Sequence, residues 1–125
     1  MELSLDNTEG YLLVRRTAAH SITLLDRELT ASFLLTPDRV VENWPVDTAN
    51  ALNAGYVDAL LALQPELVIL GSGERQIFPA AEFMAGLLRA GVGIEVMDNA
   101  AAARTYNLLA SEGRRVVAGF ILPAA

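Results

Sequence analysis

Two short polar segments of this 125-residue chain each follow an apolar run and carry the side chains best suited to chemistry. They are Gly71-Ser72-Gly73-Glu74-Arg75 and Met97-Asp98-Asn99. If the preceding runs are parallel strands, both segments lie at one edge of a sheet, where ligands bind in folds of this type. Glycine lets backbone N–H groups approach an anion, and Arg75 adds a planar donor. The pattern predicts a small-anion site. The alternative is that the glycines only turn the chain and Arg75 is solvated.

A third polar cluster, Thr105-Tyr106-Asn107, follows the Asp98-Asn99 pair along a predicted helix. Tyr106 is placed to donate to a bound anion or to orient it, and Asn107 to fix a neighbouring loop. The alternative is a structural brace of hydrogen bonds that joins the helix, its cap and the glycine turn. In either case Asp98 is expected to cap the helix.

Several classes of chemistry are excluded by residue types that the chain lacks. It has no cysteine, no lysine and a single histidine, His20. Thiol nucleophiles, cysteine-ligated metal centres, Schiff bases and P-loop lysines are therefore absent, and one histidine cannot form a multi-histidine metal site. Ser72 would need a base to act as a nucleophile, and nothing places His20 beside it. We expect no metal and no cofactor.

The glycine turn does not match a dinucleotide-binding fingerprint. Gln76 stands where the third glycine is required, and the next helix begins only near Pro79, too late for its N-terminus to hold a pyrophosphate. Acid–base chemistry by Asp98 with Glu74 and Glu95 stays open, because spacing in sequence gives no distance. No catalytic residue is assigned.

The charge of the chain limits its partners. Nine basic and fifteen acidic residues give a net charge of −6, which is the wrong sign for generic binding to nucleic acid or to anionic membranes. No apolar stretch approaches the roughly 20 residues of a membrane-spanning helix. The N-terminal residues are acidic and lack the pattern of a signal peptide, so we expect a cytoplasmic protein that does not insert into membranes. A protein partner or a second copy remains possible.

Segment 11–44 has the pattern of β-structure, with short apolar runs broken by polar turns. Strands are expected at 11–14, 21–25, 29–35 and 39–44. Because no composition shift or linker divides the chain, we expect a single domain, 1–125.

After Pro45 the apolar period changes to that of helices alternating with strands. A helix capped by Thr48 or Asn50 is expected to end at Pro65. Further expected elements are a fully buried strand 66–70, a helix 79–89 that ends at Gly91, a strand 94–97, a helix 100–112 that ends at Gly113, and a buried strand 116–122. This order predicts an α/β fold with parallel strands, βαβ crossovers and helices on both faces, to which the N-terminal strands are added.

Three segments, 65–79, 91–99 and 104–107, resemble one family through the paired glycines, Met97 and the Thr-Tyr-Asn triplet. It is the uncharacterised α/β domain of bacteria and archaea that also occurs in the mitochondrial complex I assembly factor three and in the adipogenesis-associated human protein. The resemblance implies a three-layer fold with a mixed central sheet and no established enzymatic activity. It also implies a role through protein partners, since the eukaryotic members look like assembly factors.

The candidate site residues form two groups, and all of them except Ser72 and Asn99 match the family pattern. Those facing the expected crevice are Gly71, Ser72, Gly73, Arg75, Asp98, Asn99 and Tyr106, and those expected to form the structural brace are Phe78, Pro79, Met97, Thr105 and Asn107. Ser72 and Asn99 stand where relatives more often have threonine, and Ala103 where many bacterial relatives have cysteine, which argues against thiol chemistry as the common function.

Two functional hypotheses follow. The first is a non-enzymatic protein-interaction or assembly module, which predicts an exposed apolar patch. The second is a small-anion-binding protein or enzyme whose crevice lies between the glycine turn 71–73 and the helix cap 98–99.

Overall fold

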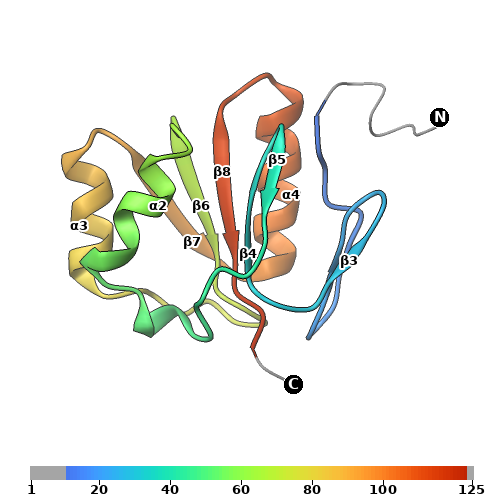
Figure 1. Ribbon diagram of the computed structural model, residues 1–125, viewed down its shortest axis with the longest axis horizontal. Helices are drawn as coiled ribbons and strands as arrows, with labels where there is room; N and C mark the ends of the chain where they lie inside the picture. Colours follow the sequence, from blue (N-terminus) through green and yellow to red (C-terminus); the bar gives the residue numbers. More distant parts are fainter. Residues whose placement is uncertain (1–10, 124–125) are drawn as a thin grey trace.

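The computed structural model describes residues 11–123 and places the chain around a mixed five-stranded sheet. Its strands, in spatial order, are β5 (Arg39–Val41), β4 (Phe33–Thr36), β8 (Val116–Phe120), β6 (Leu67–Gly71) and β7 (Gly93–Met97). Helices α2 (Val57–Leu61) and α3 (Ala81–Arg89) cover one face, and α4 (Asn99–Ser111) covers the other (Figure 1).

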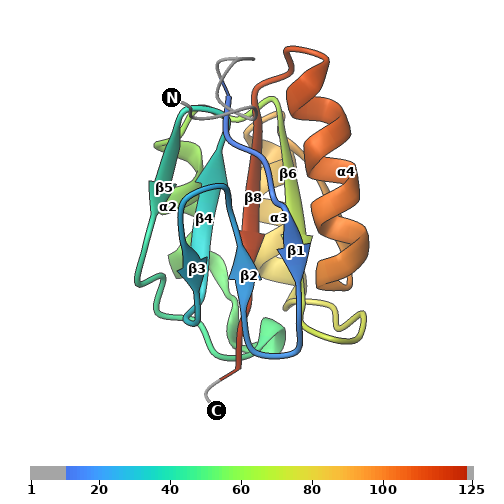
Figure 2. The same cartoon turned by 90° about the vertical axis from the view of Figure 1, so that its right-hand side faces the viewer.

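A second, three-stranded antiparallel sheet lies beside α4 (Figure 2). It consists of β1 (Arg16–Thr17), β2 (Ile22–Thr23) and β3 (Glu28–Leu29). Ile22 and Leu29 pack with Ile69 of the main sheet and Tyr106 of α4 in one buried cluster. The small sheet and α4 together form the third layer, so the expected three-layer α/β architecture is confirmed.

The parallel core follows the predicted order. β6 pairs in parallel with β7 on one side and with β8 on the other. Val68 and Leu70 point toward α3, whereas Ile69 points toward α4, so this strand is buried on both faces as its unbroken apolar run indicates. β4 pairs antiparallel with β8 and makes the sheet mixed.

The N-terminal half differs from its predicted elements. Residues 11–14 form no strand, and the strand expected at 29–35 is divided between the two sheets as β3 and β4. The division falls at Ser32, whose buried hydroxyl donates to the Val46 carbonyl at 2.6 Å and accepts from the Leu122 N–H at 2.9 Å. These tertiary bonds hold a bend that a local alternation of apolar and polar residues does not reveal.

The helix expected to end at Pro65 is also broken. Two 3₁₀ turns, Ala49–Ala51 and Ala54–Tyr56, precede the five-residue α2. The Leu52 carbonyl accepts from the N–H of Ala80 in a neighbouring segment, and the Asn53 side chain accepts from the Gly55 N–H. Neither predicted cap operates, because Thr48 hydrogen-bonds to the side chain of Asn50.

Other helix boundaries match their sequence signals. Asp98 caps α4 by accepting from the Ala101 N–H at 2.8 Å, and Gly91 and Gly113 end α3 and α4 with φ of 81° and 79°. α3 begins at Ala81, two residues beyond Pro79. Within 11–123 no helix has the length and apolar character needed to cross a membrane.

Candidate functional site

The glycine turn and the helix cap meet at the carboxyl ends of β6 and β7, as predicted. Asn99 N–H donates to the Gly73 carbonyl at 2.8 Å, and the Gly73 N–H donates back to Asn99 Oδ1 at 3.2 Å. Asn99 Nδ2 donates to the Ile121 carbonyl at 3.0 Å. The residue is 5% exposed. Asn99 therefore joins the ends of the neighbouring strands β7, β6 and β8. Its side-chain amide finds its hydrogen-bond partners within the chain.

Ser72 is committed to its own loop. Its hydroxyl donates to the Arg75 carbonyl at 2.6 Å and accepts from the Ile77 N–H at 2.9 Å. The residue is 4% exposed, and its N–H donates to the Met97 carbonyl at 2.9 Å. The single hydroxyl proton is thus held inside the turn, and His20 lies exposed in the β1–β2 hairpin. This geometry supports a turn-forming serine rather than a nucleophile.

Gly71 is required by a close approach rather than by an unusual backbone angle. A β-carbon at this position would collide with Asn99 Oδ1 and would lie 3.1 Å from the Phe120 ring and 3.2 Å from Ala102 Cβ. Gly73 is different, because its φ of 112° lies in the region that favours glycine. Gly71 therefore leaves room for the Asn99 side chain, and Gly73 allows the backbone to turn.

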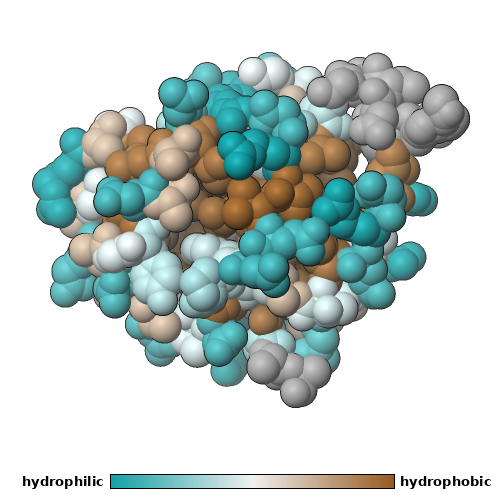
Figure 3. Space-filling view, in the orientation of Figure 1, coloured by the Kyte–Doolittle hydropathy of each residue, from teal (hydrophilic) through white to brown (hydrophobic). Residues whose placement is uncertain are grey.

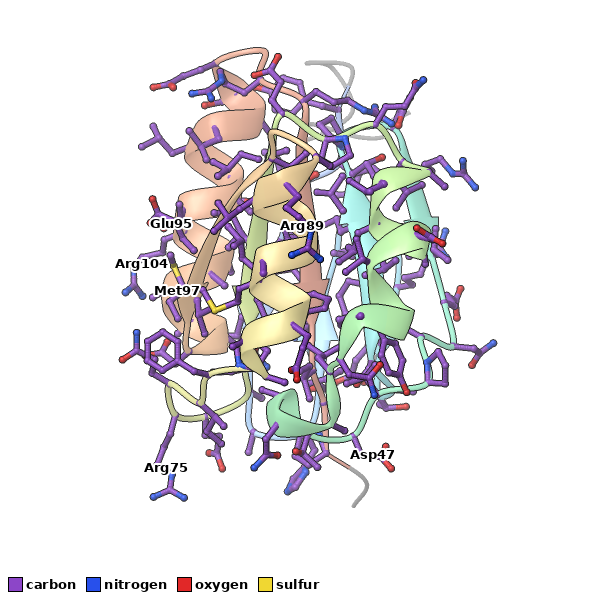
Figure 4. The ribbon with its side chains drawn as sticks, turned by 90° about the vertical axis from the view of Figure 1, so that its left-hand side faces the viewer. Asp47, Arg75, Arg89, Glu95, Met97 and Arg104 are labelled. Carbon is purple, nitrogen blue, oxygen red and sulfur yellow. The ribbon has the colours of Figure 1, made fainter. Side chains whose placement is uncertain are left out.

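A hollow of about 240 Å³ opens beside this hydrogen-bonded junction. Thr17, Ala18 and Ala19 of the β1–β2 hairpin form one wall, and Gly73, Glu74, Asp98, Asn99 and Ala100 form the other. Both ionisable side chains that line it are carboxylates. Arg75 is exposed and extends away from the molecule in Figure 4, so the structure does not bring its guanidinium to the crevice.

Tyr106 and Asn107 lie away from this hollow and hold the segment that precedes β1. The Tyr106 hydroxyl donates to the Leu12 carbonyl at 2.9 Å. Asn107 accepts from the Val14 N–H at 2.9 Å and donates to the Val14 carbonyl at 2.8 Å. Burial, with the Asp38 carboxylate as a second cause, raises the pKa of the Tyr106 phenol well above its ordinary value. Tyr106 therefore remains a donor at physiological pH.

The remaining residues of the expected brace have different surroundings from one another. Thr105 donates to the Met97 sulfur at 3.4 Å, linking α4 to β7. Pro79 is buried, whereas Phe78 is 56% exposed. The hydrogen bonds of the triplet thus join α4 to β7 and to the N-terminal segment, whereas Asn99 joins the cap to the glycine turn.

A second polar junction, at the opposite end of the sheet, has weaker sequence signals. Arg115 donates to Asp38 at 3.0 Å and to the Leu63 carbonyl, and Arg114 pairs with Glu66 at 2.8 Å. Tyr11, Pro37, Asp38 and both arginines border a hollow of about 300 Å³ there. The arginine doublet was the available signal, since adjacent basic residues in an acidic chain indicate acidic neighbours.

Asp38 makes the stability of the fold depend on pH. The Thr36 hydroxyl first, and then Arg115, hold the pKa of the Asp38 carboxyl below its ordinary value. A carboxyl with a lowered folded-state pKa stabilises the fold above its unfolded-state pKa of about 3.9, and this contribution is lost as the pH falls through the folded-state pKa. We expect Asp38→Asn to lose less stability than the wild type between pH 6 and pH 3 in urea unfolding. Equal losses would contradict this assignment.

Within residues 11–123, no group of three or more histidine, cysteine, aspartate or glutamate side chains is placed to hold a metal ion. What the junction can do chemically is hold two crossover loops in one fixed arrangement and present a small acidic hollow beside them.

Comparison with known proteins places these features in a family. The model of the family described as "Protein of unknown function (DUF498/DUF598)" matches residues 14–121. A "13 kDa major membrane protein" of Francisella tularensis is 34% identical over 57% of this chain and 58% of its own length. The protein named NADH dehydrogenase (ubiquinone) 1 alpha subcomplex assembly factor 3 of Danio rerio is 32% identical over 66% of this chain. The second alignment spans 48% of that relative, so the chain matches about half of each.

Solved structures extend the likeness to almost the whole chain. The NMR structure of a Xanthomonas campestris protein superposes with a TM-score of 0.82 and 43% identity, covering 98% of this chain and 92% of that one. A Bordetella pertussis protein described as a Mth938-like domain has a TM-score of 0.77 and 30% identity over the same fractions.

Proposed function

The chain belongs to the DUF498/DUF598 family, and from this premise we propose that it is a non-enzymatic protein-interaction module that assists the assembly of a larger complex. The name of the Danio rerio relative describes an assembly factor. A cytoplasmic location forms part of the proposal, since a net charge of −6 disfavours adsorption to anionic membranes.

The observation that carries the proposal is the use of the candidate polar side chains for internal hydrogen bonds. Ser72, Asn99 and Asn107 each bond to backbone groups of segments distant in the sequence or of their own turn. Catalytic groups need a free proton, lone pair or charge facing a substrate. These side chains instead fix the relative positions of strands, α4 and the N-terminal segment, as a rigid recognition surface requires.

Apolar side chains at the surface also support a partner-binding role. Phe78, Leu88 and Leu108 are 56%, 58% and 58% exposed. Figure 3 shows a further apolar band across the face that carries α2 and β5, rimmed by hydrophilic residues. Val41 of β5 and Leu61 of α2 are partly buried and pack against the core. Contiguous apolar surface with a polar rim is typical of protein–protein contact sites.

The proposal is tested by purifying the tagged full chain from its own cells at low salt and identifying co-eluting proteins. We expect one protein to co-elute in fixed stoichiometry through gel filtration, and equally with Arg75→Ala, because Arg75 lies outside the junction. A chain that elutes alone would overturn the proposed function.

A small-anion-binding crevice is the second candidate, favoured by the hollow at the predicted strand ends. Glu74 and Asp98 give that hollow the wrong charge for an anion, and Arg75 does not line it. A thermal-shift measurement decides the matter: phosphate or a carboxylate that raises the melting temperature of the wild type and of Arg75→Ala, but not of Ala19→Trp, whose added ring would fill the hollow, would establish the crevice instead.

A further inference from the structure

The outer edge of β7 is the longest free strand edge among residues 11–123. β7 has five residues and pairs only with β6, whereas β5 at the other end of the sheet has three residues. The strands of the small sheet have two residues each. A free edge presents unpaired N–H and C=O groups to any extended chain that lies beside it.

Two hydrogen bonds show which backbone groups of β7 face outward. The Met97 carbonyl accepts from Ser72, at the end of β6, and therefore faces inward. The Val96 carbonyl accepts from the Gln76 side chain at 2.9 Å, outside the ladder. Since successive residues of a strand direct their backbone groups to opposite sides, Ile94 faces outward with Val96. Gln76 thus occupies one of the positions at which an added strand would donate.

The α3 side of this edge is apolar. Ile94 and Val96 pack toward the α3 cluster. On α3, Gly86 lies against Val57 of α2, with its β-carbon position 2.8 Å from a Val57 methyl. Successive helical residues are separated by about 100° around the axis, so Leu88 lies on the opposite flank, next to β7. Leu88 and Phe78, which follows Gln76 by two residues, are two of the three exposed large apolar side chains in the described part of the chain.

The α4 side of the edge carries an exposed carboxylate, that of Glu95. Alternation places Glu95 and Met97 on this side, and the hydrogen bond from Thr105 to Met97 confirms the direction. Glu95 is exposed in the middle of the strand, and Figure 4 shows it at the outer margin of the molecule. Arg104, drawn near the same margin, lines a hollow with Arg15 and Arg16 on the β1 side of α4.

We propose that the β7 edge binds an extended segment of a partner protein as a sixth strand, one in which apolar and basic residues alternate. The apolar residues would lie beside Leu88 and Phe78, and a basic residue would lie opposite Glu95. A second copy of this chain fits less well, because antiparallel pairing with full overlap of two β7 strands places Glu95 opposite Glu95, and like charges directly opposite are destabilising. This inference rests on the proposed interaction function and names its surface.

The test uses a fluorescein-labelled decapeptide of alternating valine and arginine, with its valine–glutamate counterpart as control, added to the full chain. We expect saturable binding of the basic peptide only, with slowed hydrogen exchange at the Ile94 amide. Glu95→Lys and Leu88→Ser should each weaken binding about tenfold through lost charge pairing and apolar contact. Gln76→Ala should strengthen it, because the Val96 carbonyl becomes free.

Matched controls separate the edge from general attraction between a basic peptide and an acidic chain. Glu112→Lys makes the same charge change at the end of α4, and Leu108→Ser alters an equally exposed leucine on the outer face of that helix. Equal weakening by Glu95→Lys and Glu112→Lys, or no saturable binding, would overturn the docking edge. If a stoichiometric partner is nevertheless purified, the interaction function stands without this edge. If the peptide binds at the edge but the chain elutes alone, the edge stands and the proposed interaction function is overturned.

Discussion

Replacing Gly71 by alanine is expected to lower the free energy of unfolding by about 2–4 kcal/mol, through overpacking and a lost buried hydrogen bond. The added methyl group would collide with Asn99 Oδ1 and crowd Phe120 and Ala102, all in the interior. Displacing Asn99 also removes the acceptor of the Gly73 N–H and the donor to the Ile121 carbonyl. Urea unfolding measures the loss.

The double variant Gly71→Ala, Asn99→Ala separates the collision from other effects. Asn99→Ala alone leaves the Gly73 N–H and the Ile121 carbonyl without partners, at a cost of about 2–3 kcal/mol. It also removes the atom that the new methyl group would strike. The double variant should therefore lose less stability than the sum of the two single losses, by about 1 kcal/mol or more. Full additivity would show that Asn99 is not the obstacle at Gly71. Gly93→Ala, whose added carbon meets only Leu67 Cδ1 at 3.4 Å, is the matched control.

Asn107→Ala is expected to destabilise the fold by about 2–3 kcal/mol, because it leaves two backbone groups of a buried residue unpaired. Asn107 bonds to both the N–H and the carbonyl of Val14, 93 residues away. Faster hydrogen exchange at the Val14 amide, measured with the unfolding free energy, would locate the loss at the N-terminal segment.

Two further variants of α4 serve as controls for this contact. Tyr106→Phe removes one bond, to Leu12, and should cost about 1–2 kcal/mol. Ser111→Ala removes an exposed bond within the helix and should change stability by less than about 0.5 kcal/mol. An Asn107→Ala variant as stable as Ser111→Ala would contradict the role assigned to Asn107.

Elements with strong local signals were predictable from sequence. The apolar run in 66–70 predicted a strand buried on both faces, and Asp98, Gly91 and Gly113 marked helix ends with the chemistry that such ends require. The order of strands and helices after residue 66 then required parallel pairing with crossovers. That pairing is why the glycine turn and the helix cap meet.

The candidate site could be placed from sequence but not assembled. Gly71 and Asn99 were both singled out, yet their contact depends on how closely α4 approaches β6, which spacing along the chain does not encode. The partners of Tyr106 and Asn107 lie more than 90 residues away, in a segment whose apolar residues had predicted a strand. Arg75 adjoins the turn in sequence, but its side chain extends outward from the molecule.

By itself the sequence determined the α/β class, the parallel core, the helix caps and the absence of thiol and lysine chemistry, because each depends on residue types or on neighbours a few positions apart. The tertiary structure decided the division of the N-terminal strands between two sheets, the breaking of the segment before Pro65, the target of the Thr-Tyr-Asn triplet and the free edge of β7. Each of these depends on a hydrogen bond or packing contact between distant segments, which outweighs the weaker local preference.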